Sequence, residues 1–194
     1  MNVMFEAFPQ TVEVDGKEYK IVTDFREWIK LHELFQNTRK FSRATLDMIL
    51  DWYEDDPPED DRKAVRALQD FLLAESLQED DFTGEKTGQR VRQPEKPSFS
   101  FSQDAILIYS AFREIYGIDI TNIPYMHWWQ FLVLFWGLPE NTQIKERIYY
   151  RSVDLNDIES KEERKRIKKI KKLVALKENN RRKMDAYEIG DVFG

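Results

Sequence analysis

The segment YMHWWQFLVLFWGLP, at residues 125–139, constrains the fold more than any other part of the chain. It holds three of the five tryptophans, and its large side chains recur at steps of three and four residues. A helix with this spacing is apolar nearly all round, which is typical of a buried helix. We expect a core helix over about residues 124–136, with Trp128, Phe131, Phe135 and Trp136 mainly in the core. An aromatic pocket or a groove for a partner is the alternative.

A short hairpin and further helices are expected around this core helix. Val12 and Val14 alternate with polar residues before Asp15-Gly16, a dipeptide that favours a type I′ turn. Asp24 and Ser42 are suited to capping the helices that follow them. Apolar periodicity predicts the remaining helices at about residues 62–77, 102–116, 141–150 and 160–180. The predicted fold class is therefore mainly α, with six to seven helices, a small N-terminal β-hairpin and a long basic C-terminal helix.

Residues 78–98 have few apolar side chains, two glycines and two prolines, and we interpret them as a flexible linker. The linker separates an N-terminal part (1–77, hairpin plus helices) from a C-terminal helical part (99–194). One domain overall is the expectation, with a weak seam at the linker. A second loop, EDDPPEDD at 54–61, carries six acids and two prolines and is expected to be exposed. It is interpreted as a solvated loop, with attraction to a basic partner, or to the protein's own basic helix, as the alternative.

Charge is divided unevenly along the chain. The net charge is −6, yet residues 161–183 carry twelve basic and three acidic residues. The remainder of the chain therefore carries −15. Such an asymmetry points to a charged partner for the basic helix.

Several classes of site are disfavoured by the residue types present. There is no cysteine, so disulfides, thiolate metal sites and a cysteine nucleophile are excluded. Phosphate-binding glycine loops and hydrolase nucleophile motifs are absent. His127 has only His32 as a possible companion, with no metal-ligand spacing, so we interpret it as a packed or capping residue. We predict no enzyme activity, no catalytic or metal residues, no cofactor and no small-molecule substrate.

The basic helix admits four interpretations. Ile167, Ile170, Leu173 and Val174 form an apolar stripe, and lysines and arginines fill the other faces. In the simplest interpretation, the helix docks on its own domain. In two others, it binds an acidic partner helix or lies on a membrane surface. The fourth is a nucleic-acid backbone, which is the alternative function for the chain. Nucleic acid is disfavoured, because the helix lacks interleaved aromatics and the chain is acidic overall.

Four blocks carry a resemblance to a known family. They are TDFREWI (23–29), FSFSQDAILIYSAFREIYGIDI (99–120), MHWWQFLVLFWGLPENT (126–142) and IYYRSVDLNDIESKEERKRIKKIKKLVAL (148–176). Their order and spacing resemble the gene-product-fifteen family of tailed phages and prophages. The resemblance implies a tail-assembly factor of long-tailed phages, similar to chaperones that coat the tape-measure protein and recruit tail-tube subunits. It carries no catalytic residues.

The resemblance and the charge division together set the functional expectation. The chain is expected to act in the host bacterial cytoplasm, without a membrane, by protein–protein interaction with the tape-measure protein and the tail-tube protein. Self-association into a homo-oligomer stays open. The residues predicted to contact a partner are Arg151, Lys165, Arg166, Lys169 and Lys172.

Overall fold

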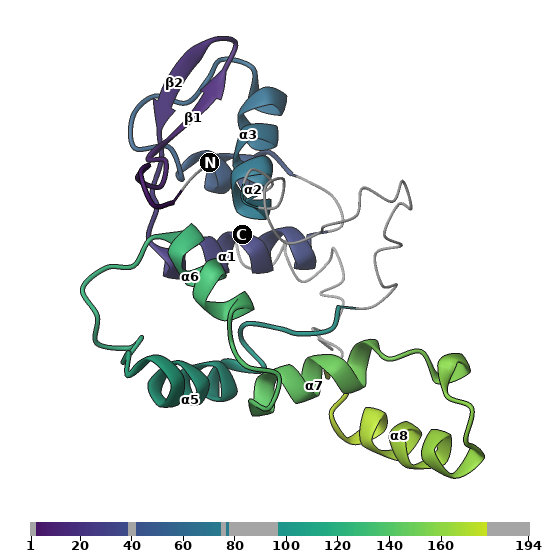
Figure 1. Cartoon of the computed structure of the whole chain (residues 1–194). Coiled ribbons are helices and arrows are strands. Elements are labelled where there is room, and N and C mark those ends of the chain that lie inside the picture. The colour runs from purple at the N-terminus through teal and green to yellow at the C-terminus, as the bar shows by residue number, and fades with distance from the viewer. Residues whose placement is uncertain (1–2, 39–41, 75–76, 78–96, 178–194) are drawn as a thin grey trace, which may run out of the picture. The chain divides into compact units, whose positions relative to one another are not determined.

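The computed structural model describes residues 3–38, 42–74, 77 and 97–177 (Figure 1). Within these residues the chain forms seven α-helices, one short 3-10 helix (η1, Leu155–Asp157) and a two-stranded hairpin. The mainly helical fold class is therefore confirmed. The helices are α1 (Phe25–Asn37), α2 (Arg43–Leu50), α3 (Asp61–Leu73), α5 (Ala105–Tyr116), α6 (Trp128–Trp136), α7 (Gln143–Ser152) and α8 (Lys161–Leu173).

The hairpin pairs β1 (Thr11–Val14) with β2 (Lys17–Lys20) in antiparallel register. Asp15 and Gly16 lie at the turn with φ of 53° and 76°, the positive values that this dipeptide predicted. Val12 and Val14 are buried on one face, so the alternation seen in the sequence fixes which side of β1 meets the core.

Two helix starts follow the predicted caps. The Asp24 carboxylate accepts a hydrogen bond from the Arg26 amide at 3.0 Å, and the Ser42 hydroxyl accepts one from the Thr45 amide at 3.1 Å. Each bond satisfies an amide that has no partner inside its helix. At the other end of α5, Gly117 adopts a positive φ of 67°, as a glycine following a helix commonly does.

The chain separates into two compact units. The first comprises Met1–Gln93 and Ile108–Pro139, and the second comprises Pro94–Leu107 and Glu140–Gly194. The predicted linker at 78–98 lies almost wholly outside the described residues. The predicted seam there stays a prediction.

The core of the first unit is built around Phe131 of α6. Its ring stacks on Phe25 of α1 at 4.8 Å between centroids and on Phe112 of α5 at 5.2 Å. Trp128 stacks on it at 5.8 Å, within the same helix. Trp128, Phe131 and Phe135 are fully buried. The aromatic segment is thus the centre of a core, as its periodicity predicted.

Hydrogen bonds from two indoles join α6 to the end of α3. The Trp128 Nε1 group donates to the Leu72 carbonyl at 3.0 Å, and the Trp129 Nε1 group donates to the Phe71 carbonyl at 2.9 Å. Carbonyls in the last turn of a helix lack partners inside it, and these indoles supply them. The next residue, Ala74, turns into the left-handed region with φ 50° and ψ 42°. This contact explains why α3 ends at Leu73 and not at the predicted residue 77.

Two expectations about α6 were wrong. Trp136 is half exposed, at 50%, because it shares with Val133 the one strip of the helix that faces outward. The helix begins at Trp128 and not near residue 124, since His127 has extended backbone angles and serves as its cap.

Candidate partner-binding surface

The basic helix α8 is shorter than the sequence predicted. It runs over Lys161–Leu173, residues 174–177 are not helical, and residues 178–180 lie outside the described part of the chain. Ser160 caps its start by accepting from the Glu163 amide at 3.4 Å. The first turn carries Glu162 and Glu163, and the last turn carries lysines. These charges interact favourably with the helix dipole and so stabilise α8.

One face of α8 packs against its own unit. Ile167 is buried and Ile170 is half-buried, and the helix contacts α7 and η1. The Lys171 ammonium donates to the Val153 carbonyl at 2.7 Å. The basic helix therefore docks on its own unit. The docked surface is the side of α8 that carries Ile167, Ile170 and Lys171.

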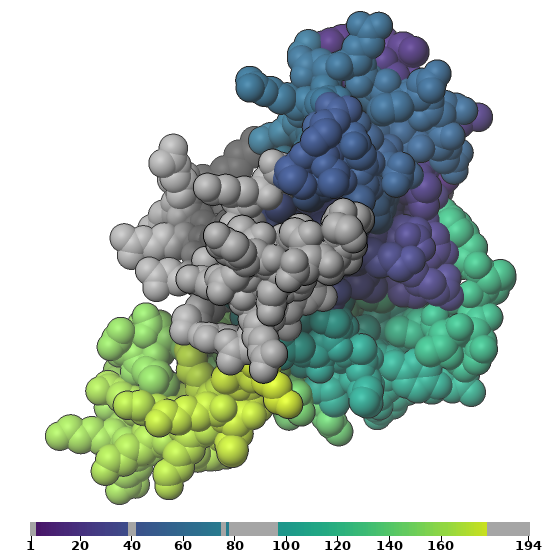
Figure 2. Space-filling model, turned by 180° about the vertical axis from the view of Figure 1, so that it is seen from behind, coloured from purple at the N-terminus to yellow at the C-terminus, as the bar shows by residue number. Residues whose placement is uncertain are grey.

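The opposite face of α8 carries a row of exposed cations. Figure 2 shows the surface of α8 in yellow-green. Lys165, Lys169 and Lys172 stand at i, i+4 and i+7, which places them on one side of the helix. No hydrogen bond or ion pair joins these three side chains to any residue that the structure describes. Arg166, at the edge of the row, forms an ion pair with Glu163 at 3.6 Å. We call these four residues the lysine face.

An exposed leucine stands beside the lysine face. Leu173, one turn beyond Lys169, is 85% exposed. A large apolar side chain surrounded by cations offers both a hydrophobic anchor and charge to a partner.

Arg151, the fifth predicted contact residue, is not part of this face. Its side chain is 6% exposed and forms a two-point pair with the fully buried Asp104 carboxylate, at 2.6 and 2.9 Å. The guanidinium also donates to the carbonyls of Val174 at 2.5 Å and Ser98 at 3.2 Å. Arg151 therefore joins α7 to the segment before α5 and to the end of α8, and it offers little surface to a partner.

A second contact fixes the chain just after α8. The Gln103 side chain donates to the Lys177 carbonyl at 2.9 Å and accepts from the Lys177 amide at 2.8 Å. These bonds explain the early end of α8, because the backbone leaves the helix to reach Gln103. The roles of Gln103 and Asp104 were not predicted from the sequence. Their partners, Lys177 and Arg151, are 74 and 47 positions away, and no spacing rule connects residues so far apart.

His127 holds α6 and the N-terminal segment together. Its Nδ1 atom accepts from the Trp129 amide at 3.0 Å, so its Nε2–H donates to the Pro9 carbonyl at 2.9 Å. Its ring stacks on Phe8 at 5.0 Å. Burial lowers the pKa of His127, only partly opposed by the bond to Pro9. These contacts match a capping residue, as the sequence indicated.

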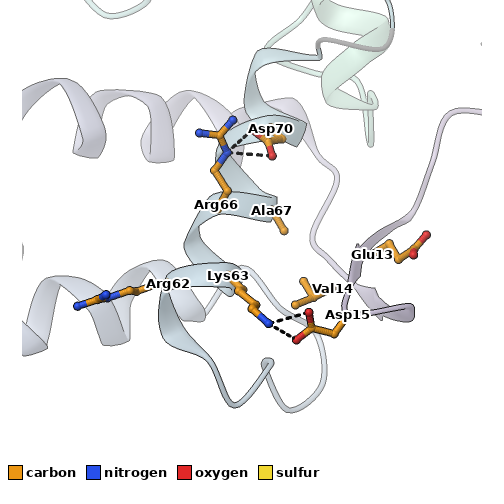
Figure 3. A pocket seen from close by; sticks show the side chains of 8 residues that line it. All are labelled: Glu13, Val14, Asp15, Arg62, Lys63, Arg66, Ala67 and Asp70. Carbon is orange, nitrogen blue, oxygen red and sulfur yellow. Dashed lines mark hydrogen bonds and ion pairs between the residues drawn. The ribbon is translucent and has the colours of Figure 1, made fainter.

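An open hollow of about 330 Å³ lies between the hairpin and α3 (Figure 3). Its cations are neutralised locally: Lys63 pairs with Asp15 at 2.7 Å, and Arg66 pairs with Asp70 at 2.8 Å. Glu13 and Arg62 also line the hollow. Every charged side chain that lines it is exposed or half-buried, so no buried polar group converges on the hollow, which has the features of an ordinary surface depression.

The described residues offer neither a metal-binding cluster nor a membrane-spanning helix. Among residues 3–38, 42–74, 77 and 97–177, histidine and acidic side chains nowhere gather in groups of three or more that could hold a metal ion. Within the described helices, none combines the length and apolar character needed to cross a bilayer.

Comparison with known proteins places the chain in a family. A family model described as "Bacteriophage Gp15 protein" matches residues 4–176, which include the hairpin, every described helix and the lysine face. No curated protein and no solved structure matches the chain significantly. The match covers most of the chain and confirms the resemblance carried by the four sequence blocks. The chain therefore belongs to the bacteriophage Gp15 protein family.

Proposed function

We propose that this protein is a tail-assembly chaperone of a long-tailed phage, and that it works by binding and not by catalysis. In the host bacterial cytoplasm it binds the tape-measure protein and then yields it to tail-tube subunits. The lysine face of α8 makes the contact. Leu173 supplies an apolar anchor beside it.

One observation carries the proposal. The lysine face is held on its own unit, because Ile167 is buried, Lys171 donates to the Val153 carbonyl, and Arg151 donates to the Val174 carbonyl just after α8. Its three lysines are nevertheless left without a partner in the described residues. A helix that is firmly docked on one side and uncompensated on the other is well suited to bind a second helix of opposite charge. Membership of the bacteriophage Gp15 protein family supports a role in a phage.

Contacts of this kind are weak and reversible. Exposed ion pairs each contribute about 0.2–1 kcal/mol and are screened by salt. A chaperone that must release its client during assembly needs such modest affinity. The proposal therefore predicts binding that falls steeply as ionic strength rises.

The test is co-expression with the tape-measure protein of the same phage, followed by pull-down and sizing at 50 and 500 mM NaCl, where the Debye screening length is about 14 and about 4 Å. A variant with Lys165, Arg166, Lys169 and Lys172 changed to Glu is expected to lose at least about tenfold in affinity, roughly the loss of two exposed pairs. A folded variant that binds as tightly as the wild type would contradict the assigned surface.

A matched control separates local contact from net charge. Lys169→Glu with Lys172→Glu is compared with Lys20→Glu and Arg62→Glu, which change the charge equally at exposed positions on β2 and α3. Only the α8 pair should weaken the complex. Absence of a complex, combined with a shift of generic duplex DNA, would favour the nucleic-acid function.

A further inference from the structure

Four carboxylates in the acidic loop at 54–61 have no partner among the described residues. Of the six acids in the loop, Asp60 caps α3 by accepting from the Arg62 amide at 3.0 Å, and Asp61 pairs with Arg43 at 2.9 Å. Glu54, Asp55, Asp56 and Glu59 are exposed. No hydrogen bond or ion pair connects their carboxylates to any described residue.

The loop that presents these carboxylates is held in place. The Glu54 amide donates to the Lys20 carbonyl at 3.1 Å, and the Tyr53 hydroxyl donates to the Ala64 carbonyl at 2.8 Å. Pro58 is buried between the exposed acids. A loop fixed at both ends loses little conformational freedom when it binds, which favours association.

The lysine face of α8 carries the charge opposite to that of the acidic loop. Lys165 and Lys172 are seven residues apart, about 10 Å along a helix axis. Lys169 lies between them. Within the described residues, one surface therefore carries three uncompensated cations and another carries four uncompensated anions.

We propose that the lysine face of one copy binds the acidic loop of a second copy of this chain. The contact is heterologous, since it joins two different surfaces. Each added copy keeps one free loop and one free lysine face, so the association extends into a chain or closes into a ring. The proposal rests on the same α8 surface as the proposed function. Self-association would keep that surface covered until a client competes for it.

The experiment uses the full-length protein alone, with no tape-measure protein present. Sedimentation velocity is measured over a hundredfold range of protein concentration at 50 and 500 mM NaCl. The weight-average sedimentation coefficient should rise with concentration at low salt, and screening should weaken the association at least about tenfold at high salt. A coefficient independent of concentration at low salt would overturn the proposal.

Charge reversal on each half assigns the contact. One variant carries Lys165→Glu, Lys169→Glu and Lys172→Glu, and the other carries Asp55→Lys, Asp56→Lys and Glu59→Lys. Each should be monomeric by itself, because like charges then face one another. An equimolar mixture should associate, since the reversed loop of one variant meets the reversed face of the other. Failure of the mixture to associate would exclude this pairing even if both variants are monomeric.

A control with the same change in net charge is available on the exposed surface. Glu13→Lys, Glu18→Lys and Glu114→Lys alter residues outside the loop, and this variant should still self-associate like the wild type. Its dissociation would mean that net charge, and not the loop, governs association. Because no client is present, these outcomes are independent of tape-measure binding.

Discussion

At the scale of single residues, Gly16 carries a conformational requirement. It has φ of +76°, and a Cβ built on it would meet no atom within 4 Å. Any effect of Gly16→Ala is therefore due to backbone strain and not to a clash. We expect this change to lower the free energy of unfolding by about 1 kcal/mol, the cost of placing a Cβ in the left-handed region.

The measurement for Gly16 is urea unfolding followed by tryptophan fluorescence. All five tryptophans belong to the first compact unit, so the signal reports on the unit that contains the hairpin. Gly16→Asn is the control, because asparagine tolerates positive φ and should lose much less stability. Equal losses in the two variants would show that φ is not the cause.

His127 gives the same unit a dependence on pH. Burial lowers its pKa in the folded protein, so the unfolded state binds more protons once the pH falls below about 6.5. Stability is then lost as the pH falls. Protonation would also place a hydrogen on Nδ1. That atom could then no longer accept the hydrogen bond from the Trp129 amide. We expect the free energy of unfolding to decrease between pH 7.5 and 5.5, by less than about 1.4 kcal/mol per pH unit for one group.

The variant His127→Asn tests this expectation, since asparagine can still cap α6 but does not titrate. It should have a flatter pH profile over the same range. His32, whose pKa is also lowered by burial, contributes in the same direction, so His32→Gln serves as the comparison. A profile left unchanged by both substitutions would assign the pH dependence to other groups.

At the scale of elements, the Arg151–Asp104 pair determines how firmly α8 is held. Arg151→Met leaves a fully buried carboxylate without its principal partner, which typically costs about 3–5 kcal/mol. Arg147 on the same helix offers a matched comparison: it approaches Asp104 only to 3.6 Å and its side chain is 42% exposed. Arg147→Met should cost less than about 1 kcal/mol.

Amide hydrogen exchange across Lys161–Leu173 measures this difference directly, because exchange reports local opening of a helix. Protection in α8 should fall strongly in Arg151→Met and little in Arg147→Met. Equal protection in both variants would mean that the apolar contacts of Ile167, and not the buried ion pair, hold α8.

Elements governed by local rules were predictable from the sequence. The Asp15-Gly16 turn and the Asp24 and Ser42 caps depend on neighbours within three residues. The ends of α3 and α8 were not predictable, because they are set by Trp128 and Gln103, which are distant in the sequence. The same reason applies to the candidate site. Helical spacing indicated the exposed lysine face, whereas nothing in the sequence links Arg151 to Asp104.

At the scale of the whole molecule, charge is distributed so that opposite signs remain available for binding. The net charge of −6 combines an acidic remainder with a basic segment, and α8 exposes Lys165, Lys169 and Lys172, which have no partner in the described part of the chain. The acidic loop leaves carboxylates unpaired in the same way. Both proposals depend on this arrangement. In each, a partner of opposite charge covers the lysine face: an acidic segment of the tape-measure protein in the first, and the acidic loop of a second copy in the other.

The most direct test of the central claim is amide hydrogen exchange on the protein with and without the tape-measure protein of its phage. A complex should form at low salt in which peptides covering α8 gain protection, while peptides covering β1 and β2 do not change. A complex that leaves α8 exchange unchanged would contradict the assigned surface. The absence of any complex at low salt would contradict the chaperone function itself.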